Sequence, residues 1–121
     1  MFVFIQQKGP DGRPITRLMG QSGPMLGRVF RLDQPLVNVG SGSHNQIVVP
    51  LAQVAPEHFQ IDLRGEQPTL RNLGAEGGTL INGFPVDHAV LEHGAHIDFG
   101  EVFEEDSEEA TAVGPAPDRR M

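Results

Sequence analysis

The residues that could carry chemistry in this 121-residue sequence are serines, histidines and carboxylates, because the sequence contains no cysteine. That absence excludes disulfide bonds, thiolate metal sites and a cysteine nucleophile. The run from Gly40 to Ser43 alternates glycine and serine, but it fails the phosphate-loop spacing G-x-G-x-x-G at Asn45. No Gly-Lys-Ser/Thr follows it, and no serine has glycine at both −2 and +2, as a nucleophile elbow requires. We therefore expect no enzyme.

Three histidines fall within nine residues and raise the question of a metal site: His88, His93 and His96. A zinc site needs three or more converging ligands. The local pattern predicts a turn at His93 and the start of a strand at His96, so the rings are not expected to converge. The sequence indicates no metal site and no cofactor.

The elements that would position these residues are short strands. Apolar runs bounded by turn residues recur about every ten residues, which is typical of an all-β sandwich or barrel. The 15 glycines and 10 prolines make long helices unfavourable. Asn82-Gly83 is a strong signal for a two-residue hairpin. Eleven strands are expected: Phe2–Gln7, Ile15–Met19, Gly27–Leu32, Pro35–Gly40, Ile47–Val49, Glu57–Leu63, Gln67–Leu73, Thr79–Ile81, Phe84–Val86, Ala89–Leu91 and His96–Phe103.

The charge is uneven along the chain, with a formal net charge of −7. Residues 101–121 hold seven acidic residues and two arginines, and we expect an acidic, disordered tail over residues 104–121. Ser107 and Thr111 in this tail are flanked by acids, a setting that suits kinase sites. Binding to nucleic acid or to an anionic membrane needs a basic face, so neither is expected. No spanning apolar stretch or signal peptide is visible, and the expected compartment is the cytoplasm.

Four blocks of the sequence follow the pattern of a known family. They are Val39-Gly40-Ser41, Val54–Phe59, Asn72–Gly83 and Leu91–Gly100. Over roughly Thr16 to Phe103 the chain resembles the forkhead-associated (FHA) domain, a β-sandwich that binds phosphothreonine peptides on loops at one end. The resemblance implies an antiparallel FHA-like sandwich of about eleven strands. The expected division is an N-terminal extension over residues 1–15, an FHA-like domain over 16–103 and the tail over 104–121.

The chain departs from the family at the positions that the resemblance assigns to phosphate and peptide binding. The family's two arginines are Ser41 and Pro56 here, its phosphate-binding serine is Ala55, and its peptide-binding asparagine is Gly77. The expected ligand-facing loops, residues 41–45, 53–57 and 74–78, contain no lysine or arginine and two glutamates. Phosphate is normally captured by cationic side chains. The phosphothreonine site is therefore expected to be lost.

The resulting expectation is a bacterial, non-enzymatic protein–protein interaction module, an adaptor or scaffold that recognises another protein without phosphorylation. That partner is expected in a Ser/Thr kinase or secretion-type assembly. Two alternatives stay open. One is weak phosphothreonine binding through Ser41, Ser43 and loop amides. The other is a homo-oligomer, such as a homodimer, built through the N-terminal strand, although Phe2 and Phe4 are expected to pack on their own chain. The partner-binding candidates are Ser41, Gly42, Ser43, His44, Asn45, Pro56, Glu57, Glu76, Gly77 and Gly78, and the structural candidates are Gly40, His58, Thr79, Asn82 and Gly83.

Overall fold

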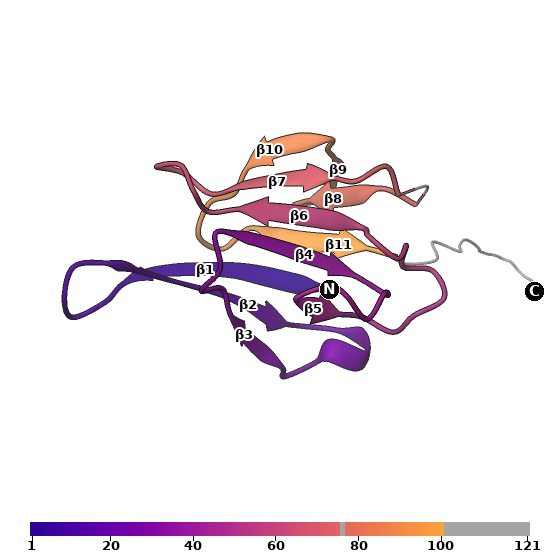
Figure 1. The fold of residues 1–121 in the computed structure, drawn as a ribbon, viewed down its shortest axis with the longest axis horizontal. Coiled ribbons are helices and arrows are strands. Elements are labelled where there is room, and N and C mark those ends of the chain that lie inside the picture. Colours follow the sequence, from indigo (N-terminus) through magenta and orange to yellow (C-terminus); the bar gives the residue numbers. More distant parts are fainter. Residues whose placement is uncertain (76, 101–121) are drawn as a thin grey trace, which may run out of the picture.

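A computed structural model describes residues 1–75 and 77–100. Two β-sheets pack face to face in it, with one short 3₁₀ helix, η1, in a loop (Figure 1). The elements in chain order are β1 (Phe2–Lys8), β2 (Pro14–Gly20), η1 (Gly23–Met25), β3 (Val29–Arg31), β4 (Leu36–Gly40), β5 (Ile47–Val48), β6 (Phe59–Asp62), β7 (Thr69–Asn72), β8 (Thr79–Ile81), β9 (Phe84–Pro85), β10 (His88–Val90) and β11 (His96–Phe99).

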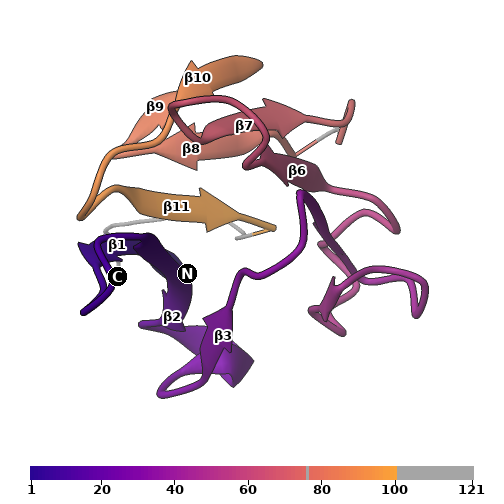
Figure 2. The same ribbon diagram turned by 60° about the vertical axis from the view of Figure 1, so that its left-hand side comes forward.

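The strands form a six-stranded sheet in the order β3-β2-β1-β11-β8-β9 and a five-stranded sheet in the order β10-β7-β6-β4-β5 (Figure 2). The expected all-β sandwich with eleven strands is confirmed over the described residues. One pairing differs from the antiparallel expectation, because β5 runs parallel to β4, with Val39 opposite Ile47. Residues 41–46 carry the chain back beside the end of β4, so β5 continues in the direction of β4.

The first strand lies inside the six-stranded sheet. β1 pairs with β2 from Phe2 to Lys8 and with β11 at Phe2 and Val3. Phe2 and Phe4 are 1% and 0% exposed, which confirms that they pack on their own chain. β1 therefore has a paired strand along its whole length on one side and at Phe2 and Val3 on the other, and the alternative of a homo-oligomer built through the N-terminal strand stays a prediction. The boundary expected at residue 16 passes through β2.

The core contains a cluster of aromatic rings between the sheets. Phe99 stacks on Phe2 at 5.7 Å between centroids, meets Phe59 edge-on at 4.9 Å and lies 5.3 Å from the ring of His58. Such pairs contribute about 0.5–1.5 kcal/mol beyond the burial of their surface. Phe59 and Ile61 on β6 are fully buried. The end of the 53–58 segment is anchored to the core through His58 and Phe59.

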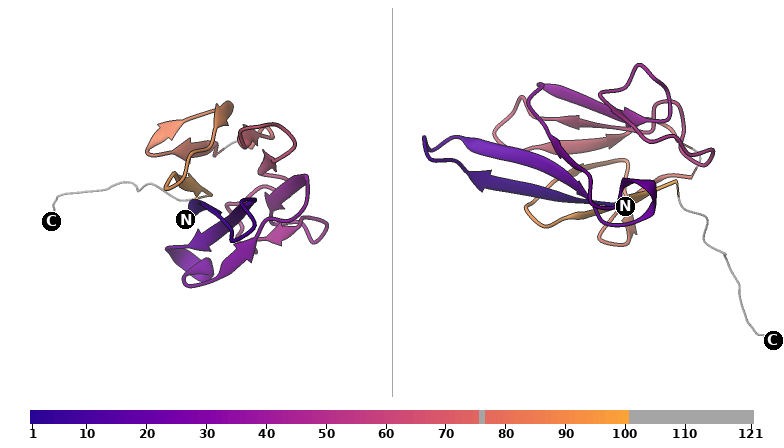
Figure 3. Two further views of the ribbon diagram at one scale, coloured as in Figure 1. Left: turned by 90° about the vertical axis from the view of Figure 1, so that its left-hand side faces the viewer. Right: turned by 90° about the horizontal axis from the view of Figure 1, so that it is seen from below.

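The two ends of the sandwich differ. The end that carries residues 40–46, 49–58 and 73–78 is called the apical end here and lies to the right in Figure 1. The turn between β1 and β2 projects at the opposite, basal end (Figure 3). No helix in the described residues is long and apolar enough to span a membrane. The expected tail over 104–121, the end of the His96–Phe103 strand, Ser107, Thr111 and Glu76 lie outside the described residues.

Candidate functional site

Two of the three apical loops are bonded to each other through their backbones. The Ser41 amide donates to the Ala55 carbonyl oxygen at 2.9 Å, and the Gly42 amide donates to the Pro56 carbonyl oxygen at 3.2 Å. A Cβ atom on Gly40 would lie 2.3 Å from the Pro56 carbonyl oxygen. Gly40 is therefore required by close approach of two backbones, as its position among the structural candidates suggested.

Asn45 holds the same two loops from inside. Its side-chain amide donates to the carbonyl oxygens of Gly42 and Pro56 at 2.6 and 2.7 Å, and the residue is only 7% exposed. Its Oδ1 atom is buried without a hydrogen-bond partner among the described residues. Asn45 was expected to contact a partner, but its buried side chain shapes the loops instead. The sequence carried no signal for this role, because its acceptors lie three and eleven residues away.

His58 brings the third loop to the other two. The Ala55 amide donates to Nδ1 of His58 at 3.1 Å, so Nε2 carries the proton and donates to the Gly78 carbonyl oxygen at 2.8 Å. The ring is fully buried. Burial lowers the pKa of His58 below its ordinary value and outweighs the opposite effect of the bond to Gly78. The neutral ring acts as a brace between loops.

Two further contacts stabilise the segment after the third loop. The hydroxyl of buried Thr79 donates to Oδ1 of Asn72 at 2.9 Å. Asn82 and Gly83 both have positive φ, 52° and 85°, as the expected two-residue hairpin turn requires. Oδ1 of Asn82 accepts the His96 amide at 2.9 Å. These residues support the sandwich and leave the exposed apical surface to others.

The exposed part of the apical surface is polar, and one side-chain contact among the described residues joins two of its loops. Ser43, His44, Pro56, Glu57 and Gly77 are all exposed. Nε2 of His44 lies 2.9 Å from Oε2 of Glu57, a contact that joins the first two loops on their outer side. Sequence reasoning placed both residues at the apex but missed this contact, because no sequence pattern relates two side chains on separate loops.

A pocket of about 340 Å³ opens between the second and third loops. Its only titratable lining residue within the described part of the chain is His58, which the two loop bonds hold neutral. The other lining residues are small or neutral: Ala52, Gln53, Val54, Ala55, Pro56, Ala75 and Gly77. The pocket is therefore lined by small or neutral side chains and by backbone groups, and the described residues contribute no cationic side chain to it.

Arg28, Arg31 and Arg71 lie outside the three apical loops. Arg28 lies over the ring of Phe30, with its guanidinium carbon 5.3 Å from the ring centroid. Arg31 on β3 is opposite Arg17. Arg71 on β7 is opposite Gln60 in the five-stranded sheet. No hydrogen bond or ion pair among the described residues connects Arg28, Arg31 or Arg71 to the apical loops.

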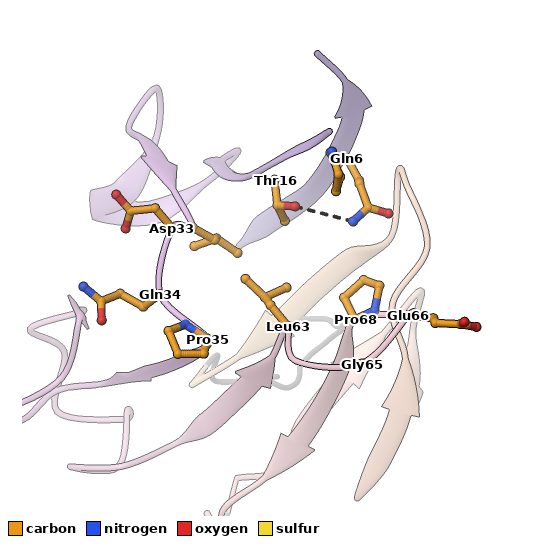
Figure 4. A pocket seen from close by; sticks show the side chains of 11 residues that line it. Gln6, Thr16, Asp33, Gln34, Pro35, Leu63, Gly65, Glu66 and Pro68 are labelled. Atoms are coloured by element: carbon orange, nitrogen blue, oxygen red, sulfur yellow. Dashed lines mark hydrogen bonds between the residues drawn. The ribbon is translucent and has the colours of Figure 1, made fainter. Parts of the chain in front are cut away.

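A second pocket, of about 300 Å³, lies at the basal end between the two sheets (Figure 4). Leu63 and Pro68 face Gln6 and Thr16 across it, and the Gln6 amide group donates to Oγ1 of Thr16 at 3.4 Å. Asp33 and Glu66 are exposed lining residues. The described lining residues include no nucleophile paired with a base.

No group of three or more potential metal ligands converges within residues 1–75 and 77–100. His88 lies on β10, His93 in the turn before β11 and His96 on β11. Nδ1 of His93 accepts the Gln6 amide at 3.1 Å. The three rings are thus distributed over separate elements.

Known proteins resemble this chain in sequence. The glycogen accumulation regulator GarA of Mycolicibacterium smegmatis is 32% identical over 94 residues, which make up 76% of this chain and 60% of GarA. The oxoglutarate dehydrogenase inhibitor of Corynebacterium jeikeium is 30% identical over 104 residues, which make up 84% of this chain and 71% of that protein. The chain therefore spans about 60% of the length of GarA.

Solved structures resemble the fold as well. The FhaA FHA domain, complexed with the intracellular domain of Rv3910, matches at a TM-score of 0.58 and 30% identity over 61% of this chain and 81% of that chain. Mycobacterium tuberculosis EmbR, in complex with a low-affinity phosphopeptide, matches at a TM-score of 0.68 and 21% identity over 76% of this chain and 24% of EmbR. The EmbR likeness shows the fold alone.

The model of the FHA domain matches residues 37–100, more than half of the sequence. The matched segment begins in β4 and contains all three apical loops and the braces that hold them. Since the sandwich, the loop arrangement and the sequence match agree, this chain belongs to the FHA domain family.

Proposed function

We propose that this FHA domain is an adaptor that recognises another protein through its apical loops and does not require a phosphate group on that protein. The observation that carries the proposal is the charge of the apical surface. The three loops contain no lysine or arginine, and the carboxylate of Glu57 is exposed beside His44. A phosphate dianion would meet a negative side chain there and no cationic one, whereas a neutral or basic protein surface would not be repelled.

Several backbone amides of the apical loops already have acceptors within the fold. An anion nest needs several amides with free N–H groups. The amides of Ser41, Gly42 and Asn45 already donate to carbonyl oxygens within the loops, and the amide of Ala55 donates to His58. The alternative of weak phosphothreonine binding therefore relies on the Ser41 and Ser43 hydroxyls and on the loop amides that have no acceptor within the fold. We consider it the second candidate function.

The relatives support an adaptor role. GarA is named a glycogen accumulation regulator and the other relative an oxoglutarate dehydrogenase inhibitor, and the FHA domain is a protein–protein interaction module. By analogy, we propose that this chain takes part in a regulatory assembly, for which a Ser/Thr kinase or secretion-type system was expected. The cytoplasmic location stays a prediction from the sequence.

A titration separates the two candidate functions. A phosphothreonine peptide and the same peptide with unmodified threonine would be titrated into the full chain by calorimetry. Phosphorylation-independent recognition predicts no preference for the phosphorylated form. A preference of about tenfold or more, about 1.4 kcal/mol, would overturn the proposal in favour of the second candidate.

A capture experiment tests the positive part of the proposal. The full chain would be immobilised and exposed to a host lysate, half of which has been treated with a phosphatase. We expect the same proteins to be retained from both halves and to be lost with the His44→Ala/Glu57→Ala variant. Glu66→Ala at the basal end is the matched control. Loss of the retained proteins after phosphatase treatment, or equal loss with the basal variant, contradicts the proposal.

A further inference from the structure

Strand β3 ends the six-stranded sheet, so one of its edges has no neighbouring strand in the described residues. The Arg28 carbonyl accepts the Gly20 amide, and the Leu32 amide donates to the Thr16 carbonyl. These bonds direct every second backbone group of β3 toward β2. By the alternation of an antiparallel ladder, the N–H and C=O groups of Val29 and Arg31 point to the open edge. An open edge of this kind is a template for an added strand.

The open edge borders a groove of about 380 Å³. On one side are Val29, Phe30 and Arg31, and on the other side are Val37 and Ile47, from the last two strands of the five-stranded sheet. Val29 is 54% exposed. In Figure 1 both β3 and β5 lie on the lower side of the molecule, away from β10. Asp33, Gln34 and Gln46 also line the groove, so its walls are part apolar and part polar.

The edge is positively charged. Arg28 and Arg31 are exposed at the two ends of β3, and Arg17 lies directly opposite Arg31 on β2. Like charges placed opposite each other destabilise a sheet. No ion pair from the described residues reaches any of the three arginines, and Asp33 is the one acid among the described residues that line the groove. An acidic strand beside β3 would relieve the repulsion between Arg17 and Arg31.

We propose that the acidic segment of this same chain that follows β11, residues 101–109, binds the groove and adds a strand to the open edge of β3. This segment contains six acidic residues and no basic one. The charge of the segment is therefore opposite to that of the edge.

The place where the described chain ends makes this contact reachable. Gly100 lines a hollow together with Ser22, Gly23 and Pro24, in the loop that leads into β3. A strand added to the open edge of β3 lies four strand spacings from β11, about 19 Å in total. About six extended residues span that distance. The acidic residues at the end of the segment, Glu108 and Glu109, are then the ones that reach the three-residue strand β3.

A second copy of the chain is a poorer occupant of the same edge. Pairing β3 with β3 of another copy would bring Arg28 and Arg31 of both copies together, which like-charge repulsion disfavours. The intramolecular contact also benefits from a high effective concentration, because the segment is joined to β11.

Amide hydrogen exchange measured by NMR on the full chain tests the contact. The amides of Val29 and Arg31 would be compared with those of a full-length variant that neutralises the run, Glu104→Gln/Glu105→Gln/Asp106→Asn/Glu108→Gln/Glu109→Gln. We expect these two amides to exchange at least about tenfold more slowly in the unmodified chain than in the variant at low salt. The difference in exchange rate is expected to shrink in 1 M salt, because that salt concentration screens charges separated by more than about 3 Å. Equal exchange in both proteins overturns the proposal.

Two further measurements keep the test specific. Arg28→Gln/Arg31→Gln is expected to remove the protection, whereas Arg71→Gln, which neutralises an exposed arginine on β7 in the other sheet, is the matched control and is expected to keep it. Retained protection in the first variant, or equal loss in the control, contradicts the proposal. Protection that grows with protein concentration would assign the edge to a second copy and would likewise overturn the intramolecular contact.

Discussion

Nε2 of His58 donates a hydrogen bond to the carbonyl oxygen of Gly78 at 2.8 Å, across twenty positions of the chain. The same ring accepts the Ala55 amide, so one buried side chain holds two apical loops. An accepting Nδ1 atom and a donating Nε2 atom are available together only in the neutral imidazole. The geometry of the apical surface therefore depends on the protonation state of one residue.

The stability of the protein is expected to fall as the pH decreases through the range in which His58 would take up a proton. Burial lowers the pKa of His58 in the folded protein, while the unfolded chain has a pKa near 6.5. The unfolded state therefore binds the proton more tightly, and the contribution is complete above about pH 6.5 and is lost between that value and the folded pKa. Urea unfolding of the full chain between pH 8 and pH 5 measures it.

The control for this titration is His88→Gln, which removes an exposed histidine on β10. That variant is expected to retain the pH dependence, whereas His58→Gln is expected to flatten it and to lower the free energy of unfolding at pH 8. An unchanged slope in His58→Gln contradicts the assignment.

Replacing Gly40 with alanine is expected to destabilise the protein by about 1–3 kcal/mol, because the added Cβ would lie 2.3 Å from the backbone oxygen of Pro56. Gly77→Ala is the matched control on the third loop, since a Cβ there meets nothing within 4 Å. Its effect is expected to stay within about 0.5 kcal/mol. Denaturant unfolding measures the free energy of unfolding of both variants. An equal loss of stability in the two variants would contradict the close packing of the first two loops.

Thr79→Val is expected to cost about 1 kcal/mol of stability, because it removes the hydroxyl that donates to Oδ1 of Asn72 and leaves that oxygen without its partner. Thr69→Val on β7 is the control, since Thr69 is half-buried and its hydroxyl makes no hydrogen bond within the described part of the chain. Thermal unfolding measures both. An equally large loss of stability in Thr69→Val would show that the hydrogen bond from Thr79 to Asn72 does not stabilise the protein.

Phosphothreonine binding is expected to appear when the cationic and hydroxyl groups of the family pattern are restored by Ser41→Arg/Ala55→Ser/Pro56→Arg. Charge-assisted hydrogen bonds from two arginines would then face a phosphate at the apex. We expect a preference of at least about tenfold for the phosphorylated peptide in calorimetry. Gln34→Arg/Gln67→Arg adds the same charge at the basal end and is expected to show none. A correctly folded apical variant without the preference would mean that the apex is closed to phosphate for another reason.

Local patterns predicted most of the strands. The alternation of apolar and polar residues from Phe59 to Leu63 marks β6, because side chains on a strand point alternately to its two faces. Asn82-Gly83 marks the β8–β9 hairpin, because these two residue types tolerate positive φ. The lack of phosphate-binding side chains at Ser41 and Ala55 is a prediction from the family resemblance.

The sequence by itself determined the strand composition, the hairpin turns and the neutral-to-acidic character of the apical loops, since these depend on residues that are neighbours along the chain. The tertiary structure alone decided that β1 lies between β2 and β11, that Asn45 is buried between two loops and that His44 meets Glu57. It also decided that Arg31 faces Arg17 at an open edge. Each of these contacts joins residues that are distant in sequence, and the packing of the two sheets, which no local pattern encodes, brings them together.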